Sequence, residues 1–188
     1  LMPPTLFAGA SDDFSHILVS SHERFTEDAP DLGFEFMLYE WVNGELTLAS
    51  VAPDGTPMVG SVSGVRPISA DGSRLYWQPL AAEGPLYLRE GGTSRLVSKR
   101  QTDDSDATAG FLVASRDGST AYLRSADRLT ADASAVGFDL YRYDADSDEI
   151  VDLTPESEGA SGAGVQGVVG TSLDGDIVYF VAEGALAP

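Results

Sequence analysis

The chain has 188 residues, of which 43% are hydrophobic and 22% are charged, so it has the composition of a folded domain and not of a disordered segment. Its formal net charge of -19 disfavours binding to nucleic acids and to anionic membrane surfaces. Cysteine is absent, which excludes disulfides and thiolate metal sites, and no apolar run approaches the roughly 20 residues of a membrane helix.

A four-residue phrase, Ser-x-Asp-Gly, recurs along the chain with strand-like apolar runs on both sides of it. A degraded copy, Ser11-Asp12-Asp13-Phe14, stands near the start, and complete copies begin at Ser69, Ser115 and Ser172. Asp-Gly between apolar runs is a strong hairpin signal, because glycine takes the positive φ that a tight turn demands. The copies therefore indicate a repeated β-hairpin.

Two further phrases follow each of the first three copies, always in the same order. The first runs over residues 38–41, 86–89 and 140–143, and the second over residues 45–48, 95–98 and 149–154. The joins between them are turn-like: Asn43-Gly44, Gly91-Gly92 and the longer segment 144–148. Each unit is therefore predicted to contain four antiparallel strands, and such units at periods of about 40–50 residues are typical of β-propeller blades.

The fold class predicted from this repeat is all-β, a partial β-propeller of about three and a half blades. The blades are expected at about 8–56, 65–102 and 110–155, with a partial blade at 165–188. Because propellers close with about four to eight blades, the whole chain, 1–188, is expected to be a fragment of one propeller domain. The segments 22–33, 128–137 and 155–164 are expected to be loops at the blade rim, and no segment has helical periodicity.

The repeat units resemble those of a known family. The segment 68–76 followed by Leu86-Tyr87 is similar to the repeat of TolB-like β-propellers, and so is 114–119 followed by 139–143 and 152–154. The likeness covers nearly the whole chain from about Gly9 and extends in particular to large TolB-like proteins of GC-rich actinobacteria. It implies a propeller of six or more blades outside the cytoplasm, used as an interaction platform or attached to a hydrolase. The motif residues are structural in that family, so the resemblance implies no catalytic residue.

The acidic segment 144–148 is the strongest candidate for a ligand site in the sequence. Asp144, Asp146 and Asp148, followed by Glu149, alternate like the oxygen ligands of a calcium loop. The glycine and the distal glutamate of an EF-hand are missing, and the sister units have plain turns at this place. A structural turn is the preferred interpretation and a calcium site the alternative. A second acidic cluster, 102–106, is expected to be a solvated loop.

The remaining candidates are also interpreted structurally. His16 is expected at the start of a strand and His22 in an acidic loop, and neither is predicted to be catalytic. The Asp of each Asp-Gly turn is expected to cap backbone amides. Aromatic residues at matching strand positions indicate packing between blades. These are Tyr39, Trp41, Tyr76, Trp77, Tyr87, Tyr122, Tyr141, Tyr143 and Tyr179.

The sequence favours a non-catalytic scaffold or recognition module that mediates protein–protein or ligand interaction through its rim loops. No catalytic, cofactor-binding or metal-binding residue is assigned. The alternative is the propeller portion of a larger extracytoplasmic hydrolase or lyase whose catalytic residues lie outside this chain. The expected partners are another protein or the remaining blades of the parent chain, without nucleic acid and without membrane insertion. A homo-oligomer formed through exposed strand edges is a further alternative.

Overall fold

A computed structural model of the chain describes residues 5–31, 33–79, 84–155, 162–184 and 186. The regular structure in this part of the chain consists of β-strands, and it includes no helix that could cross a membrane. The strands are β1 (Thr5–Ala10), β2 (His16–Ser21), β3 (Met37–Val42), β4 (Glu45–Leu48), β5 (Arg74–Trp77), β6 (Tyr87–Glu90), β7 (Thr93–Leu96), β8 (Gly110–Ala114), β9 (Thr120–Ser125), β10 (Asp139–Asp144), β11 (Glu149–Asp152), β12 (Val165–Thr171) and β13 (Val178–Ala182).

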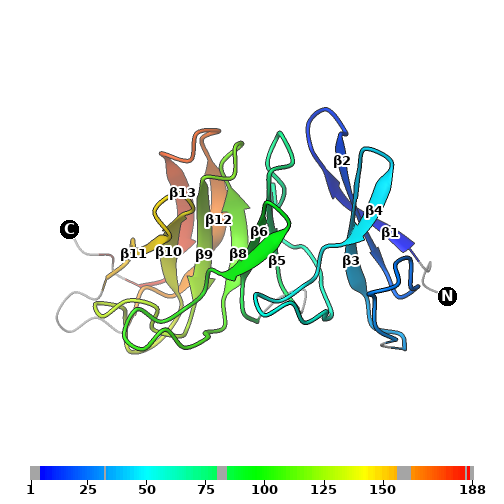
Figure 1. Cartoon of the computed structure of the whole chain (residues 1–188). Helices are drawn as coiled ribbons and strands as arrows, with labels where there is room; N and C mark the ends of the chain where they lie inside the picture. Colours follow the sequence, from blue (N-terminus) through cyan, green and yellow to red (C-terminus); the bar gives the residue numbers. More distant parts are fainter. Residues whose placement is uncertain (1–4, 32, 80–83, 156–161, 185, 187–188) are drawn as a thin grey trace.

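The strands form sheets that stand side by side in chain order (Figure 1). β1 to β4 form blade 1, β5 to β7 form blade 2, β8 to β11 form blade 3, and β12 with β13 form blade 4. Within each blade every strand pairs antiparallel with the next strand of the sequence, which is the meander of a propeller blade. The all-β propeller architecture predicted from the repeat is therefore confirmed.

Blade 2 departs from the predicted four strands, because its regular sheet has three. Its innermost segment contains Pro67, which has no amide hydrogen to donate, and Arg66, whose φ of 54° leaves the extended region. The segment is therefore reduced to isolated bridges. One joins Ile68 to Leu75 within the blade, and a parallel bridge joins Val65 to Val113 of blade 3.

The Ser-x-Asp-Gly turn has the same three hydrogen bonds in all four copies. In the second copy, the Ser69 hydroxyl donates to Asp71 Oδ1 at 2.7 Å, the Ser73 amide donates to the same oxygen at 3.0 Å, and the Arg74 amide donates to Ser69 Oγ at 3.0 Å. Corresponding bonds hold the other three turns. In the degraded first copy only the glycine is replaced, by Phe14 at a φ of 59°.

The second residue of each turn connects neighbouring blades through its backbone. The Asp12 amide donates to the Ala70 carbonyl at 2.9 Å, the Ala70 amide to the Arg116 carbonyl at 2.7 Å, and the Arg116 amide to the Leu173 carbonyl at 2.7 Å. These bonds run in one direction through all four blades. We call this series the turn ladder.

A tyrosine seven residues after the serine adds a second bond at the same junction. The Tyr76 hydroxyl donates to the Gly118 carbonyl at 2.8 Å, and the Tyr122 hydroxyl donates to the Gly175 carbonyl at 2.7 Å. Each tyrosine is almost fully buried and reaches into the turn of the following blade. The repeated tyrosine is therefore a contact between blades.

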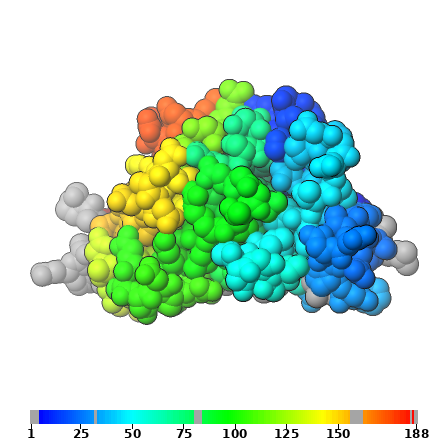
Figure 2. Space-filling model, in the orientation of Figure 1, coloured from blue at the N-terminus to red at the C-terminus, as the bar shows by residue number. Residues whose placement is uncertain are grey.

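The hydrophobic core lies between neighbouring sheets. On the outside, the atoms of successive blades form one continuous surface (Figure 2). The Tyr76 ring stacks on Phe111 of blade 3, with centroids 5.2 Å apart. Most of the aromatic residues expected between blades are buried, but Trp41 and Tyr179 are 37% and 67% exposed. The packing prediction is wrong for these two residues, whose side chains remain accessible to solvent.

The glycine of the turn is required by space as well as by its positive φ. A Cβ atom on Gly72 would lie 2.2 Å from Cγ of His16, and one on Gly175 would lie 2.8 Å from Cβ of Thr120. Gly44, at the tip of the β3–β4 hairpin, also has a positive φ but has nothing within 4 Å of such an atom. Gly72 and Gly175 are therefore required both by close packing and by backbone conformation, whereas Gly44 is required by backbone conformation alone.

We expect Gly72→Ala to destabilise the fold more than Gly44→Ala. Both variants carry the strain of a positive φ, about 1–2 kcal/mol, but Gly72→Ala adds roughly 1–3 kcal/mol of overpacking against His16. Urea unfolding of the two variants measures the difference. Equal losses of unfolding free energy would show that the turn does not press against the preceding blade.

Candidate functional site

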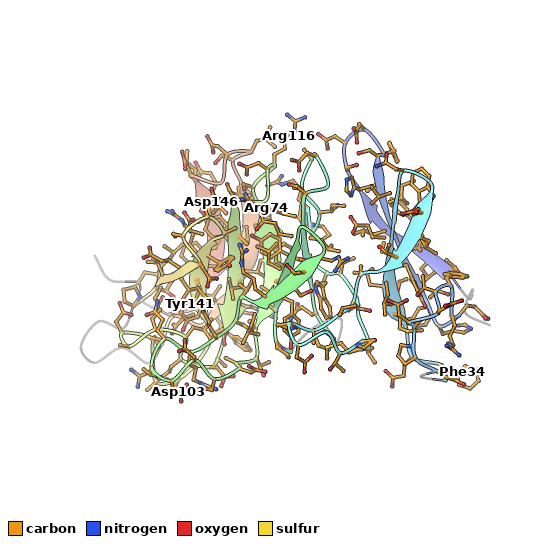
Figure 3. All side chains as sticks on the ribbon, viewed as in Figure 1. Phe34, Arg74, Asp103, Arg116, Tyr141 and Asp146 are labelled. Carbon is orange, nitrogen blue, oxygen red and sulfur yellow. The ribbon has the colours of Figure 1, made fainter. Side chains whose placement is uncertain are left out.

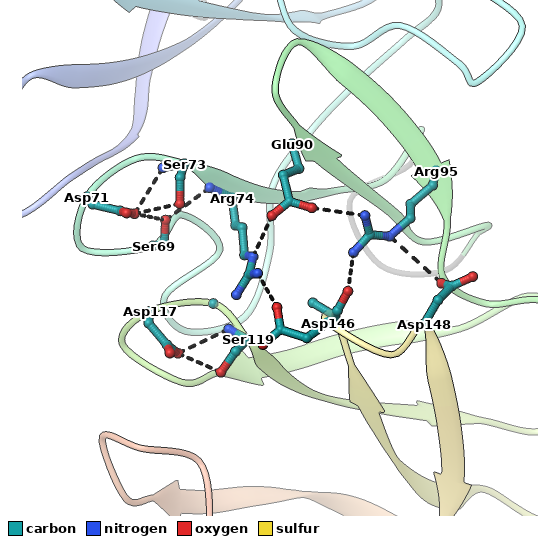
Figure 4. Close-up of polar contacts among 12 residues, drawn as sticks. Ser69, Asp71, Ser73, Arg74, Glu90, Arg95, Asp117, Ser119, Asp146 and Asp148 are labelled. Atoms are coloured by element: carbon teal, nitrogen blue, oxygen red, sulfur yellow. Dashed lines mark hydrogen bonds and ion pairs between the residues drawn. The ribbon is translucent and has the colours of Figure 1, made fainter.

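The β10–β11 hairpin, where the sequence suggests a turn or a calcium loop, is bound by cationic side chains of blade 2 (Figure 4). The Arg74 guanidinium pairs with Asp146 and also with Glu90, whose Oε1 lies 2.8 Å from Arg74 Nε. Lys99 Nζ lies 2.7 Å from Asp148 Oδ2. Two of the alternating carboxylates are therefore held by cationic side chains of the neighbouring blade.

Arg95 extends this network. Its Nη1 donates to Glu90 Oε2 at 2.9 Å, its Nε donates to the Tyr143 hydroxyl at 2.9 Å, and the Tyr143 hydroxyl donates to Asp148 Oδ1 at 2.7 Å. The hydrogen bond from Arg74 is the main cause that lowers the pKa of Glu90. Burial opposes ionisation of Asp148, but hydrogen bonds from Lys99 and Tyr143 outweigh it and lower the pKa of this carboxyl.

The third alternating carboxylate, Asp144, binds backbone amides of its own turn instead of a cationic side chain of blade 2. Asp144 Oδ1 accepts the amides of Asp146 and Ser147, each at 3.0 Å, and so caps the turn. Within the described ranges no three His, Cys, Asp or Glu side chains gather into a metal-binding group. The geometry therefore favours the structural turn over the calcium site. The other acidic cluster is also a turn, in which Asp103 Oδ1 accepts the Ser105 amide at 3.0 Å.

We expect Arg74→Met to lower the free energy of unfolding by about 1–3 kcal/mol, because it removes charge-assisted bonds to two carboxylates. Arg142→Met is the matched control, since Arg142 lies on the exposed side of the same hairpin, 3.8 Å from Asp144, where a pair contributes about 0–1 kcal/mol.

Millimolar calcium should leave the melting temperature unchanged. A calcium-induced rise that Asp146→Ala abolishes would restore the calcium interpretation.

His16 lines a cavity of about 210 Å³ between blades 1 and 2. Its Nδ1 lies 2.7 Å from Glu40 Oε1, and Glu40 Oε2 lies 3.7 Å from Arg89 Nε. Ser73 also lines the cavity, but its hydroxyl donates to Asp71 and not to the imidazole. The cavity therefore holds a cluster of polar side chains that spans two blades, and its serine does not make the serine–histidine bond of a hydrolase.

His22 lies apart from this cluster, in the loop between β2 and β3. Its ring makes T-shaped contacts with those of Phe34 and Phe36, with centroids 6.3 Å and 5.5 Å away. The structure thus separates the two histidines and gives each a local structural contact. The expected position of His16 at the start of a strand is confirmed, since β2 begins there.

Two carboxylates buried in blade 3 were not singled out by the sequence. Asp139 is 2% exposed and Asp152 is 7% exposed, and no Arg or Lys in the described structure pairs with either. One oxygen of each accepts an amide, from Ser134 at 2.7 Å and from Thr154 at 2.7 Å. Asp139 Oδ1 and Asp152 Oδ2 are buried without a hydrogen-bond partner among the described residues.

Blade 1 has apolar residues at the equivalent positions. Tyr39 of blade 1 pairs with Leu48, and Tyr141 of blade 3 pairs with Asp152 in the same register. Aligning the repeat phrases around these tyrosines would have revealed the change from an apolar to an acidic position. Burial is the main cause that raises the pKa of Asp152 to about 6, and the nearby carboxylate of Asp139 adds to it.

This raised pKa gives stability a distinct pH dependence. The native state binds the Asp152 proton more tightly than the unfolded chain, where the pKa is near 3.8, so the free energy of unfolding falls as the pH rises from about 4 to about 6. The slope is at most about 1.4 kcal/mol per pH unit. Asp152→Leu, which copies blade 1, should remove this fall and stabilise the chain at pH 7.5.

Urea unfolding between pH 4 and 7.5 measures this effect. Asp103→Asn is the control, since its carboxylate lies in an exposed turn whose serine donors lower its pKa, so the fall above pH 4 should persist. If the free energy of unfolding of Asp152→Leu still falls between pH 4 and 6 as it does in the parent chain, Asp152 is not the source of the pH dependence.

Comparisons with known proteins support the fold. No protein-family profile and no curated protein matches the sequence. A solved structure described as a candidate TolB from Agrobacterium tumefaciens matches with a TM-score of 0.50 and 16% sequence identity, over 94% of this chain and 53% of that one. The chain thus has a TolB-like propeller fold and spans about half the length of the structure it matches.

Proposed function

We propose that this propeller is a non-catalytic recognition module and that the loop between β2 and β3 carries its recognition surface. The observation that supports this proposal is the contrast between that loop and the repeat motifs. The polar side chains of the Ser-x-Asp-Gly turns bind one another and the backbone, as described above. The loop instead presents Phe34, which is 92% exposed, far from the turn that carries Arg116 (Figure 3).

The loop is anchored at its start. The Tyr39 hydroxyl donates to the Glu23 carbonyl at 2.8 Å, and the Phe25 amide lies 3.4 Å from the same hydroxyl. Blade 3 repeats this anchor, where the Leu129 amide lies 3.4 Å from the hydroxyl of Tyr141, but Leu129 is fully buried. Phe25 is partly exposed at the equivalent position, so blade 1 presents an aromatic side chain where blade 3 buries an aliphatic one.

The chemistry of the loop indicates the kind of partner. The loop sequence that contains Phe25 and Phe34 also contains five exposed carboxylates, at Glu23, Glu27, Asp28, Asp31 and Glu35. Aromatic side chains on an anchored loop are typical of contact surfaces, and acidic neighbours favour a partner with the opposite charge. The proposed partner is therefore a protein with a basic surface around an apolar pocket. The family resemblance adds the proposal that the encounter takes place outside the cytoplasm.

Photo-crosslinking tests this role. With p-benzoylphenylalanine in place of Phe34, we expect a discrete crosslinked product in extracts of the source organism. The same probe in place of Val136, an exposed apolar residue of the blade 3 loop, is the matched control and should give no such product. Identical products from both positions, or none from Phe34, would contradict recognition by this loop.

A further inference from the structure

The first strands of blades 1, 3 and 4 (β1, β8 and β12) each contain a β-bulge, where one extra residue interrupts the pairing. The bulged residues are Ala8, Leu112 and Val169, and each stands three residues before the serine of its turn. The equivalent residue of blade 2 is Arg66, three residues before Ser69. Blade 2 therefore has a charged side chain where the other blades have small or aliphatic ones.

The backbone of Arg66 also differs from that of the bulged residues. Its φ is 54°, whereas none of the other three has a positive φ. Such a conformation costs free energy in a non-glycine residue and persists only where the surrounding structure holds it. Here the Val65 amide donates to the Leu112 carbonyl at 2.9 Å, and Arg66 Nε donates to the Ala114 carbonyl at 2.7 Å. These bonds to blade 3 fix the place of the guanidinium.

The Arg66 guanidinium leaves most of its hydrogen-bonding capacity unused. Apart from the bond at Nε, no hydrogen bond or ion pair joins it to another residue in the described ranges. Its Nη2 is buried without a partner there. A buried donor of a charged group is destabilising when it lacks an acceptor. Because aliphatic residues occupy this position in other blades, the fold itself does not require a guanidinium here.

Arg66 lines a cavity of about 200 Å³ that is bounded by residues of blades 2, 3 and 4. The cavity lies where β8 and β12 run side by side (Figure 1). The bulged residues Leu112 and Val169 also line it, and the remaining lining residues are valines, Gly170 and Thr171. None of the lining side chains is acidic. The cavity therefore combines a single cationic group with mainly apolar walls.

We propose that this cavity is a binding site for a monocarboxylate with a short aliphatic chain. The carboxylate pairs with the Arg66 guanidinium, whose planar donors match two carboxylate oxygens, and the chain lies against the apolar walls. One guanidinium balances one negative charge, and the net charge of -19 disfavours ligands that carry more. The site is separate from the β2–β3 loop, so this proposal is independent of the recognition role of that loop.

The size of the cavity limits the chain of the ligand. An apolar cavity of about 150 Å³ is large enough for benzene, so one of about 200 Å³ accommodates a chain of roughly four to six carbons. Two sources offer this chemistry, a free aliphatic acid and the C-terminus of a peptide whose last residue is aliphatic. Both present a carboxylate next to an apolar group.

A titration followed by nuclear magnetic resonance tests the site in the parent chain. The probes are 4-methylpentanoate and its uncharged analogue 4-methylpentanamide. We expect the acid to shift the amide signals of Val113 and Val168 with a dissociation constant in the millimolar range. The analogue should bind about tenfold more weakly or less, because it cannot form the charged pair with Arg66. This comparison uses no variant, so it does not depend on whether a substituted chain folds.

A second pair of probes separates the two sources of the carboxylate. The tripeptide Gly-Gly-Leu is compared with the same tripeptide amidated at its C-terminus. If Gly-Gly-Leu binds more tightly than 4-methylpentanoate, the ligand is a chain terminus, and if it binds more weakly, the ligand is a free acid. In either case the carboxylate form should bind about tenfold more tightly than the amide form.

Arg66→Leu is the matched variant, because it copies Leu112 of blade 3. Leucine and arginine are both unbranched at Cβ, so the substitution adds little strain at this φ. We expect Arg66→Leu to lose the preference for the acid over the amide, and Arg142→Met, which changes an exposed arginine, to keep it. The proposal is overturned if neither carboxylate shifts the signals, if the amides bind as tightly as the acids, or if Arg66→Leu keeps the preference.

Discussion

The bond from the serine hydroxyl to the aspartate carboxylate in each Ser-x-Asp-Gly turn is the constraint on which the rest of the structure depends. It fixes the turn in a shape that leaves the second residue's amide and carbonyl free to bond with neighbouring turns. The hydroxyl and amide donors lower the pKa of Asp71 to about 2, so the carboxylate stays ionised across the physiological pH range. The turn ladder, the close packing of the turn glycines against the preceding blade, and the hydrogen bonds from Tyr76 and Tyr122 all depend on this shape.

Each junction between blades combines this shared frame with its own chemistry. The junction of blades 1 and 2 contains the His16–Glu40–Arg89 cluster, and that of blades 2 and 3 contains Arg74 with Asp146. The junction of blades 3 and 4 is mainly apolar. A blade placed at the wrong junction would lose these polar partners, and it is costly to leave a mostly buried charged side chain such as Arg74, Arg89 or Glu40 unpaired. Because the turns are alike but the side-chain contacts differ from junction to junction, these contacts favour one order of the blades.

The sequence predicts the frame well because the frame depends on local signals. Asn43-Gly44 predicts a hairpin from two adjacent residues, and both have a positive φ in the structure. The hairpin at 144–148 could not be decided in this way, since Arg74, which binds Asp146, lies 72 residues away. Contacts between units, unlike turns within them, leave no fixed spacing in the sequence.

The turn ladder uses only the backbone of its second residue, so the side chain there is unconstrained. Asp12, Ala70, Arg116 and Leu173 accordingly comprise an acid, a methyl group, a base and an aliphatic chain at one equivalent position. The pair formed by Arg116 and Asp12 is exposed and contributes little to stability. These positions form a row along one end of the blades where single mutations can change surface chemistry without disturbing the fold. Such a row gives evolution a means of altering specificity while the architecture is preserved.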